Sequence, residues 1–376
     1  MARQSNFARK SKMSKLNNLI NELCPNGVEY KKLCDVTKMK RGTSATKKDL
    51  QVGTIPVISG GREPAFYCNK SNRDGETITV AGSGVGAGYV QYWNIPVFVN
   101  DAFSVKGNEK LMTKYIFYFL SSIQNKIYAT KKGGGIPHVH ISSIENFLIP
   151  IPPIEVQREI VRILDNFTEY IALLEKELIF RKKQYVYYSD LLIKSAKSSE
   201  YLILKDIATI SRGIRVVRKQ LETTGNIPVY QNSMIPLGYY EKINCKANTT
   251  FIIGAGAAGE IGFSYVDFWA ADDCYYFVCS KKILDKFLYY ALLCRYDFIK
   301  SQVRKASIPR LSRSVVENLK LPIPPIDEQE RIVKILDRFD NLCNNITTGL
   351  PAEISARQKQ YKYYHDKILQ FRIKNT

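Results

Sequence analysis

Histidine is scarce in this sequence, and cysteine pairs with the spacing of metal sites are missing. The 376 residues include three histidines (His138, His140 and His365) and eight cysteines without a CxxC pair. A structural zinc site needs four such ligands at short, characteristic spacings. The sequence therefore predicts no metal site, and we expect the thiols to be buried and unpaired, as is usual in a reducing compartment.

Long apolar runs are also missing. No run of eighteen apolar residues is present, so we expect no transmembrane helix. The first residues, MARQSNFARKSKMSK, lack the apolar core of a signal peptide. We therefore expect a cytoplasmic protein without a membrane partner. The basic first dozen residues are expected to form a loose arm, more simply a solvated tail than a DNA contact.

The chain does contain a long internal duplication. Residues 149–171 (IPIPPIEVQREIVRILDNFTEYI) recur at 321–343 (LPIPPIDEQERIVKILDRFDNLC), and 181–192 recur at 357–368. The residues before each of these segments match as well, with IPV at 55–57 and again at 227–229. The period is far longer than that of a solenoid repeat, so a whole module has been duplicated once.

A long helix is predicted in each copy. A proline pair suits a helix start but not its interior, and an acidic residue follows each pair. Apolar residues then recur at steps of three and four, the period of a helix seam. A helix from Glu155 to Lys194 would be roughly 60 Å long. The expected coiled-coil seam consists of Ile160, Leu164, Phe167, Ile171, Ile332, Leu336 and Phe339.

The duplication predicts four segments. Residues 1–148 and 198–320 are two globular domains, and 149–197 and 321–376 are the two long helices. Short strands, glycine-rich turns and short helices near 114–121 and 286–293 predict an α+β class without regular βαβ units. One helix leads from the first domain to the second and the other leads back, so the helices run antiparallel and the copies are related by a pseudo-twofold axis.

Two glycine-rich turns resemble nucleotide-binding motifs. Residues 254–259 (GAGAAG) fit GxGxxG and residues 82–87 (GSGVGA) fit GxGxxA, with Asp273 and Asp101 about twenty residues further on. The helix that would hold a phosphate is missing, because alternating aromatic residues typical of a strand follow each turn. We therefore expect tight glycine hairpins.

No catalytic motif is recognisable. The chain has no G-x-x-x-x-G-K-[ST] of a P-loop ATPase and no Asn-Pro-Pro-aromatic tetrapeptide, which amino-methyltransferases use to hold the target amine. His138 and His140 occur in the first copy only, where the second has Arg310 and Ser312. A duplicated catalytic site would keep such a pair, so we expect a non-catalytic chain.

Acidic residues are outnumbered, with 35 Asp and Glu against 55 Lys and Arg and a formal net charge of +20. Such an excess, spread over a globular chain, favours nucleic acid as the partner. Basic loop residues would neutralise phosphates, and Gln231 and Asn232 are candidate readers of base edges. The candidate DNA-binding residues are Lys38, Lys40, Arg41, Lys47, Lys48, Arg62, Lys70, Arg73, Lys131, Lys132, Arg212, Arg215, Arg218, Lys219, Gln231, Asn232, Arg304, Lys305, Arg310 and Arg313.

The order of variable domain, PIPPIEVQREIVRILD helix, second variable domain and PIPPIDEQERIVKILD helix resembles the specificity (S) subunit of type I restriction–modification systems. The resemblance covers essentially the whole chain. It implies two target recognition domains that each read one half of a bipartite sequence in double-stranded DNA. It also implies that the helices space the half-sites and dock two modification (M) subunits.

The same resemblance implies where the chemistry of such a complex takes place. The M subunits would bring S-adenosylmethionine and methylate adenine, and restriction (R) subunits would use ATP and magnesium to translocate and cleave DNA. No cofactor is expected in this chain. Two alternatives stay open: a self-sufficient methyltransferase or nuclease with an unrecognised site, and a basic coiled-coil protein that binds RNA or a partner protein.

One stretch departs from the repeat. The second helix contains about four extra residues at Thr347-Thr-Gly-Leu-Pro351, which have no counterpart in the first helix. Thr348 is a suitable helix cap and Pro351 a suitable residue for a new first turn. Four is also the length of a coiled-coil stutter. We therefore expect an interruption of the second helix here.

Overall fold

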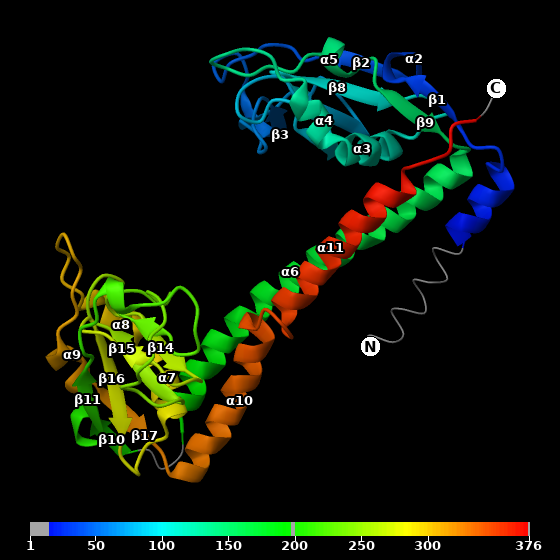
Figure 1. The fold of residues 1–376 in the computed structure, drawn as a ribbon. Coiled ribbons are helices and arrows are strands. Elements are labelled where there is room, and N and C mark those ends of the chain that lie inside the picture. Colours follow the sequence, from blue (N-terminus) through cyan, green and yellow to red (C-terminus); the bar gives the residue numbers. More distant parts are fainter. Residues whose placement is uncertain (1–14, 197–199, 375–376) are drawn as a thin grey trace. The chain divides into compact units, whose positions relative to one another are not determined.

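The chain forms two compact units, drawn in Figure 1 from blue at the N-terminus to red at the C-terminus. The structure is a computed structural model and describes residues 15–196 and 200–374. Unit 1 consists of Met1–Leu173 and Ile354–Thr376, and unit 2 of Leu174–Glu353. The basic N-terminal arm expected from the sequence lies outside the described residues. The division into four segments stays a prediction.

Unit 1 begins with a helix over residues 15–23 and continues with short strands and helices. Its further elements are β1 (Glu29–Lys32), α2 (Leu33–Val36), β2 (Thr37–Arg41), β3 (Val52–Ile58), β4 (Phe66–Cys68), β5 (Thr77–Ala81), β6 (Val90–Trp93), β7 (Phe98–Val99), β8 (Ala102–Gly107), α3 (Thr113–Ser122), α4 (Gln124–Ala129), α5 (Ile141–Ile144), β9 (Leu148–Ile151) and the start of α6 (Ile154–Lys194).

Unit 2 repeats this order with few changes. Its elements are β10 (Glu200–Ile203), η1 (Leu204–Asp206), β11 (Ala208–Arg212), η2 (Arg218–Gln220), β12 (Val229–Tyr230), β13 (Thr249–Ile253), β14 (Ile261–Ser264), β15 (Trp269–Ala270), β16 (Cys274–Cys279), α7 (Asp285–Leu293), α8 (Tyr296–Ser301), α9 (Arg313–Glu317), β17 (Lys320–Ile323), α10 (Ile326–Asn344) and the start of α11 (Leu350–Ile368).

An antiparallel sheet of four strands lies at the centre of each unit. The strand order is β2-β8-β5-β6 in unit 1 and β11-β16-β13-β14 in unit 2. The registers correspond too, since Met39 lies opposite Val105 in one sheet and Ile210 opposite Phe277 in the other. The duplicated sequence therefore folds into a duplicated domain, and the α+β class is confirmed.

The short helices expected near residues 114–121 and 286–293 are α3 and α7. Each packs against the central sheet of its unit, α3 on β5, β6 and β8 and α7 on β13, β14 and β16. Tyr115, Ile116 and Phe119 recur at helical spacing in α3 and are buried in the unit 1 core, as Phe287 and Tyr290 of α7 are in unit 2. Burial of this apolar face is what holds these helices in place.

A buried glutamine attaches each long helix to its unit. Gln157 Oε1 accepts a hydrogen bond from Met112 N at 2.9 Å, and its Nε2 donates to the carbonyl oxygens of Lys110 and Pro152 at 2.9 and 2.8 Å. Gln329 makes the same three bonds in unit 2, with Leu284 N and the carbonyl oxygens of Lys282 and Pro324. Each glutamine thus uses both amide hydrogens and its carbonyl oxygen to fix the start of the helix.

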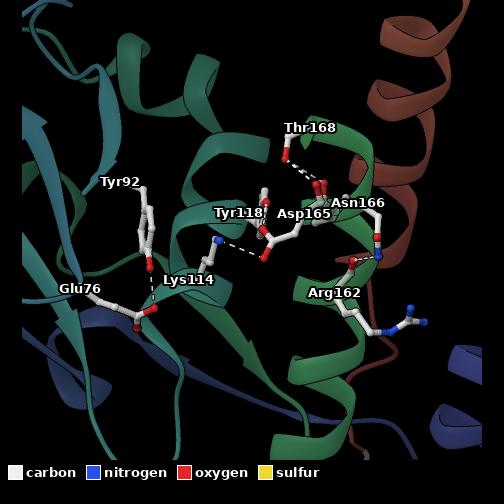
Figure 2. A network of polar contacts seen from close by, with 9 residues as sticks. Glu76, Tyr92, Lys114, Tyr118, Arg162, Asp165, Asn166 and Thr168 are labelled. Atoms are coloured by element: carbon white, nitrogen blue, oxygen red, sulfur yellow. Dashed lines mark hydrogen bonds and ion pairs between the residues drawn. The ribbon is translucent and has the colours of Figure 1, made fainter. Parts of the chain in front are cut away.

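About two turns further along α6, an aspartate binds α3 to α6 (Figure 2). Lys114 Nζ lies 2.9 Å from Asp165 Oδ2, and the Tyr118 hydroxyl donates to the other carboxylate oxygen. In unit 2, Asp337 accepts a hydrogen bond from the Tyr290 hydroxyl at 2.5 Å and lies 3.8 Å from Lys286 Nζ. The recurrence of Asp165 as Asp337 is therefore explained by its role in attaching the helix.

The residues expected in the helix seam have two kinds of partner. Ile160 and Leu164 are fully buried in the unit 1 core, and Ile332 and Leu336 are fully buried in the unit 2 core. The apolar stripe is continuous in sequence, but its first turns pack against the globular domain of each unit.

The long helices contact each other at the two phenylalanines of the stripe. The Phe167 ring centroid lies 5.7 Å from that of Tyr364 in α11, and Ile171, one turn further on, is half-buried. The Phe339 ring of α10 lies 6.3 and 5.9 Å from Tyr185 and Tyr188 of α6. Early residues of α6 meet late residues of the second helix and late residues of α6 meet early ones, so the helices run antiparallel, as expected.

The second long helix is interrupted, as expected, between α10 and α11. The turn between them begins at Asn345, whose Oδ1 accepts hydrogen bonds from Thr347 N at 2.8 Å and Thr348 N at 3.1 Å. That Thr348 caps the next helix stays a prediction. The helix restarts at Leu350 with Pro351 in its first turn, where proline is tolerated. The first long helix, α6, runs without interruption for 41 residues.

All eight cysteines lie in the described part of the chain and are free thiols. Five are buried, and burial raises the pKa of the Cys245 thiol to about 12. The expectation that all would be buried is wrong for Cys34, which is exposed at the surface of α2, and Cys279 and Cys294 are only partly covered.

Candidate nucleic-acid interface

The two glycine-rich turns are hairpins, as the sequence predicts. In unit 1 residues 82–88 connect β5 to β6, and in unit 2 residues 254–259 connect β13 to β14, each pair antiparallel. Gly84 and Gly256 both have positive φ values, which residues other than glycine rarely adopt. No helix follows either turn, so neither has the free N–H groups that hold a dinucleotide phosphate.

Two further loops join the hairpin of unit 1, and we call residues 59–64, 82–88 and 131–140 loop cluster 1. Gly84 N donates to the carbonyl oxygen of Pro137 at 3.0 Å, and Val139 N donates to that of Gly82 at 2.9 Å. A Cβ added at Gly60 would lie 2.2 Å from the Ser83 carbonyl oxygen. The three loops are therefore held together by backbone contacts that leave no space for larger residues.

Unit 2 has the same arrangement in residues 231–236, 254–259 and 303–312, which we call loop cluster 2. Gly256 N donates to the Pro309 carbonyl oxygen at 3.0 Å, and Leu311 N to that of Gly254 at 2.8 Å. Ala257 N donates to the Asn232 carbonyl oxygen at 2.8 Å. The backbone framework is thus shared, whereas the side chains that it presents differ between the units.

Loop cluster 1 contains several basic side chains. The Arg62 guanidinium lies 5.0 Å from the ring centroid of Tyr89, and Lys131 Nζ lies 4.4 Å from that of Tyr128. Lys132 is exposed, and the stacked rings of His138 and His140 lie beside it in the same loop. Aromatic contacts orient the two cations without neutralising them, so the cluster presents positive charge to solvent.

Loop cluster 2 is basic as well. Its exposed basic residues are Arg304, Lys305 and Arg310. The backbones of Arg304 and Arg310 pair in an isolated antiparallel β-bridge. Since both clusters combine loops joined by backbone hydrogen bonds with exposed cations, both suit a polyanion such as nucleic acid.

Some candidate residues instead hold the fold together. Arg73 donates from Nε to Ser104 Oγ at 2.7 Å and from its terminal nitrogens to three backbone carbonyl oxygens; burial lowers the pKa of this arginine. Arg212 Nε donates to the Asp272 carbonyl oxygen at 2.7 Å, and Gln231 Nε2 to the Asp272 carboxylate at 3.3 Å. Arg313 forms an ion pair of 2.7 Å with Glu317.

The other candidates occupy exposed positions around the central sheets. Asn100 hydrogen-bonds both Ala45 and Ser59, so it connects the basic loop after β2 with loop cluster 1. The exposed candidates outside the clusters are Lys38, Lys40, Arg41, Lys47, Lys48, Lys70, Arg215, Arg218 and Lys219. Whether each one contacts DNA stays a prediction.

The exposed apolar residues of the clusters were not among the site residues predicted from the sequence. Val85, Ile136, Ile235 and Ile308 all lie there with more than half of their surface exposed. The repeated Ile-Pro pair at 136–137 and 308–309 was a usable signal, because it falls at the same place in both copies.

Within residues 15–196 and 200–374, no group of three His, Cys, Asp or Glu side chains could hold a metal ion. No helix in those ranges is both long enough and apolar enough to span a membrane.

Comparisons with known proteins decide the family. The family model of the type I restriction modification DNA specificity domain matches residues 25–179 and again 197–356. The chain belongs to this family. Each match covers one copy of the internal repeat, so the duplication is a pair of specificity domains.

Relatives along the whole chain support this assignment. A protein of Haemophilus influenzae described as a type I restriction enzyme specificity subunit is 29% identical over 92% of this chain and 96% of its own. A type I restriction enzyme specificity subunit of Escherichia coli is 28% identical over 96% of this chain and 98% of its own. The crystal structure of the S subunit from M. genitalium has the same fold, with a TM-score of 0.67 at 20% identity over 91% of this chain and 96% of that one.

Proposed function

We propose that this chain is the DNA specificity subunit of a type I restriction–modification complex. Each unit reads one half of a bipartite target in double-stranded DNA, and the long helices space the two halves and dock two M subunits. R subunits join the same complex in the cytoplasm. The chain itself supplies recognition and assembly and does not catalyse a reaction.

One observation carries the proposal: the same backbone framework occurs twice and presents different side chains. The hairpin hydrogen bonds to Pro137 and Pro309 are equivalent, as are the anchors Gln157 and Gln329. His138 of cluster 1 is replaced by Arg310 in cluster 2. A symmetric framework with unlike surfaces suits a split target whose halves differ, because side chains at base edges carry the sequence information.

The chemistry is proposed to belong to partner subunits. S-adenosylmethionine would bind to M subunits, and ATP and magnesium to R subunits. In this chain the glycine turns that resemble nucleotide sites connect two strands and lack a following helix. This geometry supports recognition without a bound cofactor.

A genome-wide map of methylated adenine tests the proposal, made in the source cell with this gene intact and deleted. We expect a split motif with two unlike halves and a fixed gap to disappear on deletion. An unchanged map would contradict the proposal when an M subunit co-purifies with the chain.

Two rival functions have their own tests. A self-sufficient enzyme would show turnover when the purified chain alone is incubated with DNA and either S-adenosylmethionine or Mg²⁺. An RNA-binding protein would prefer RNA when duplex DNA competes with it at fixed salt concentration, which must be controlled because phosphate contacts are salt-dependent. We expect no turnover and a preference for duplex DNA.

A further inference from the structure

Both loop clusters expose apolar side chains to solvent. Val85, at the tip of the first hairpin, has 96% of its surface exposed, and Ile136 beside it has 62%. In unit 2 the exposed fractions are 78% for Ile235 and 53% for Ile308. Single exposed apolar residues are ordinary. These four, however, lie on loops that the backbone locks together, in the same region of both units.

The fold presents one isoleucine identically in the two units. Ile136 and Ile308 each precede the proline whose carbonyl oxygen accepts a hydrogen bond from the hairpin, from Gly84 N or from Gly256 N, in both cases at 3.0 Å. The proline is therefore fixed on the hairpin, and the isoleucine is held outward beside it. A side chain fixed by the backbone loses little conformational entropy when it binds.

The second apolar position differs between the units. The hairpin tip carries Val85 in cluster 1 but Ala257 in cluster 2, and Ala257 N is bonded to the Asn232 carbonyl oxygen of the adjacent loop. That adjacent loop brings Ile235 to the cluster. Each cluster thus has one apolar side chain at a shared position and one from a different loop.

The basic groups beside these apolar side chains indicate which partner they bind. Lys131 Nζ donates to the Val85 carbonyl oxygen at 3.3 Å, so a positive charge lies next to the exposed valine. In unit 2, Arg304 and Lys305 are exposed in the same loop as Ile308. Duplex DNA offers phosphates next to apolar groups, because the thymine 5-methyl group projects into the major groove.

We propose that Val85 and Ile136 in unit 1, and Ile235 and Ile308 in unit 2, contact thymine 5-methyl groups in the major groove and so specify T·A pairs in the two half-sites. This inference rests on the proposed function and deepens it, because it names residues that determine specificity. The shared isoleucines predict a T·A pair in both halves. Val85 and Ile235, which come from different loops, specify pairs that distinguish the halves.

The test selects bound sequences from a pool of duplexes with a randomised region. The full chain is used together with its co-purifying M subunits, and the pool is prepared once with thymine and once with uracil, which lacks the 5-methyl group. The variants are Val85→Ala and Ile235→Ala. Controls are Leu148→Ala in β9 and Val278→Ala in β16, whose side chains are 56% and 55% exposed away from the clusters. Because all four side chains are exposed, the substitutions leave the core intact.

We expect Val85→Ala to weaken the preference for T·A at one position of the first half-site by about fourfold. This is the ratio expected for burial of a single thymine methyl group. Ile235→Ala should do the same in the second half-site only, and both controls should select the wild-type sequence. With the uracil pool, wild type should lose these preferences. If wild type selects a split sequence but the two variants select it equally well, or uracil is selected as strongly as thymine, the inference is wrong and the proposed function stands. If wild type selects no split sequence, the proposed function itself fails.

Discussion

At the scale of single residues, two glutamines connect sequence to architecture. Gln157 and Gln329 are fully buried and each makes three hydrogen bonds to backbone groups. Neither the proline pair nor the apolar stripe would by itself fix where the helix meets the domain. The recurrence of glutamine at this position is therefore a structural requirement of the fold and not a feature of the target.

Replacing Gln157 by Leu should destabilise unit 1 by about 2–4 kcal/mol, because Met112 N and two carbonyl oxygens lose buried partners. Chemical denaturation followed by circular dichroism measures the change. Gln370→Leu, at an exposed position of the same unit, is the control and should change the free energy of unfolding by less than about 0.5 kcal/mol. Equal stabilities of the two variants would show that the anchor contributes nothing.

His365 should make unit 1 sensitive to pH. Its ring is buried against Tyr118 and Tyr361, and burial lowers its pKa despite the opposing charge of Asp366. The folded protein therefore takes up the proton less readily than the unfolded chain. Stability should fall as pH drops below about 6.5, the usual histidine pKa, by at most about 1.4 kcal/mol per pH unit.

Unfolding of wild type and His365→Phe between pH 7.5 and 5.5 measures this effect. The variant keeps an aromatic ring in place but carries no titratable group, so the part of the slope due to His365 should vanish. Gln370→Leu, an exposed change in the same unit that removes no titratable group, should keep the wild-type slope. A His365→Phe slope identical to wild type would contradict the assignment.

At the scale of elements, sequence patterns predicted those helices and turns whose formation depends on neighbouring residues in the chain. The period of three and four residues predicted α6, and glycines followed by alternating aromatic residues predicted both hairpins. The role of Asn345 between α10 and α11 was not predicted, because only the folded turn shows that its side-chain oxygen accepts hydrogen bonds from Thr347 N and Thr348 N.

The same limit applies to the candidate interface. Arg73 and Arg62 look alike in sequence, as basic residues in loops. Arg73 is bound by Ser104 and by backbone oxygens from β2, more than thirty residues away, whereas Arg62 is exposed. Composition predicted a basic surface, but only tertiary neighbours separate side chains that hold the fold from those free to bind phosphate.

The interruption between α10 and α11 depends on close packing at Gly349. A Cβ there would lie 2.4 Å from the Asn341 carbonyl oxygen and 2.7 Å from that of Asn345. Gly349→Ala should therefore destabilise unit 2 by about 1–3 kcal/mol through overpacking. Thermal unfolding measures it, with Gly135→Ala as the control because nothing lies within 4 Å of a Cβ at Gly135. A Gly349→Ala variant as stable as wild type would mean that the turn adapts easily.

At the scale of the whole molecule, the C-terminal residues complete unit 1. Val28 N donates to the Arg372 carbonyl oxygen at 2.8 Å, and Lys374 N donates to that of Val28 at 3.0 Å. The Tyr30 hydroxyl donates to the Phe371 carbonyl oxygen at 2.9 Å. The first domain is thus closed by residues from the far end of the sequence, which segment boundaries drawn from the repeat alone do not reveal.

Because the C-terminal residues bond to Val28 and Tyr30, the boundaries chosen for a domain exchange should affect the stability of unit 1. Exchanging residues 1–148 for the corresponding part of another family member should change the first half-site only, as read from methylated adenine. A second chimera that exchanges residues 37–147 keeps Val28, Tyr30 and their C-terminal partners, and it should show the same new half-site with higher thermal stability. A change in the second half-site in either chimera would refute the independence of the two units. Equal stability of both chimeras would show that the C-terminal contacts add little to unit 1.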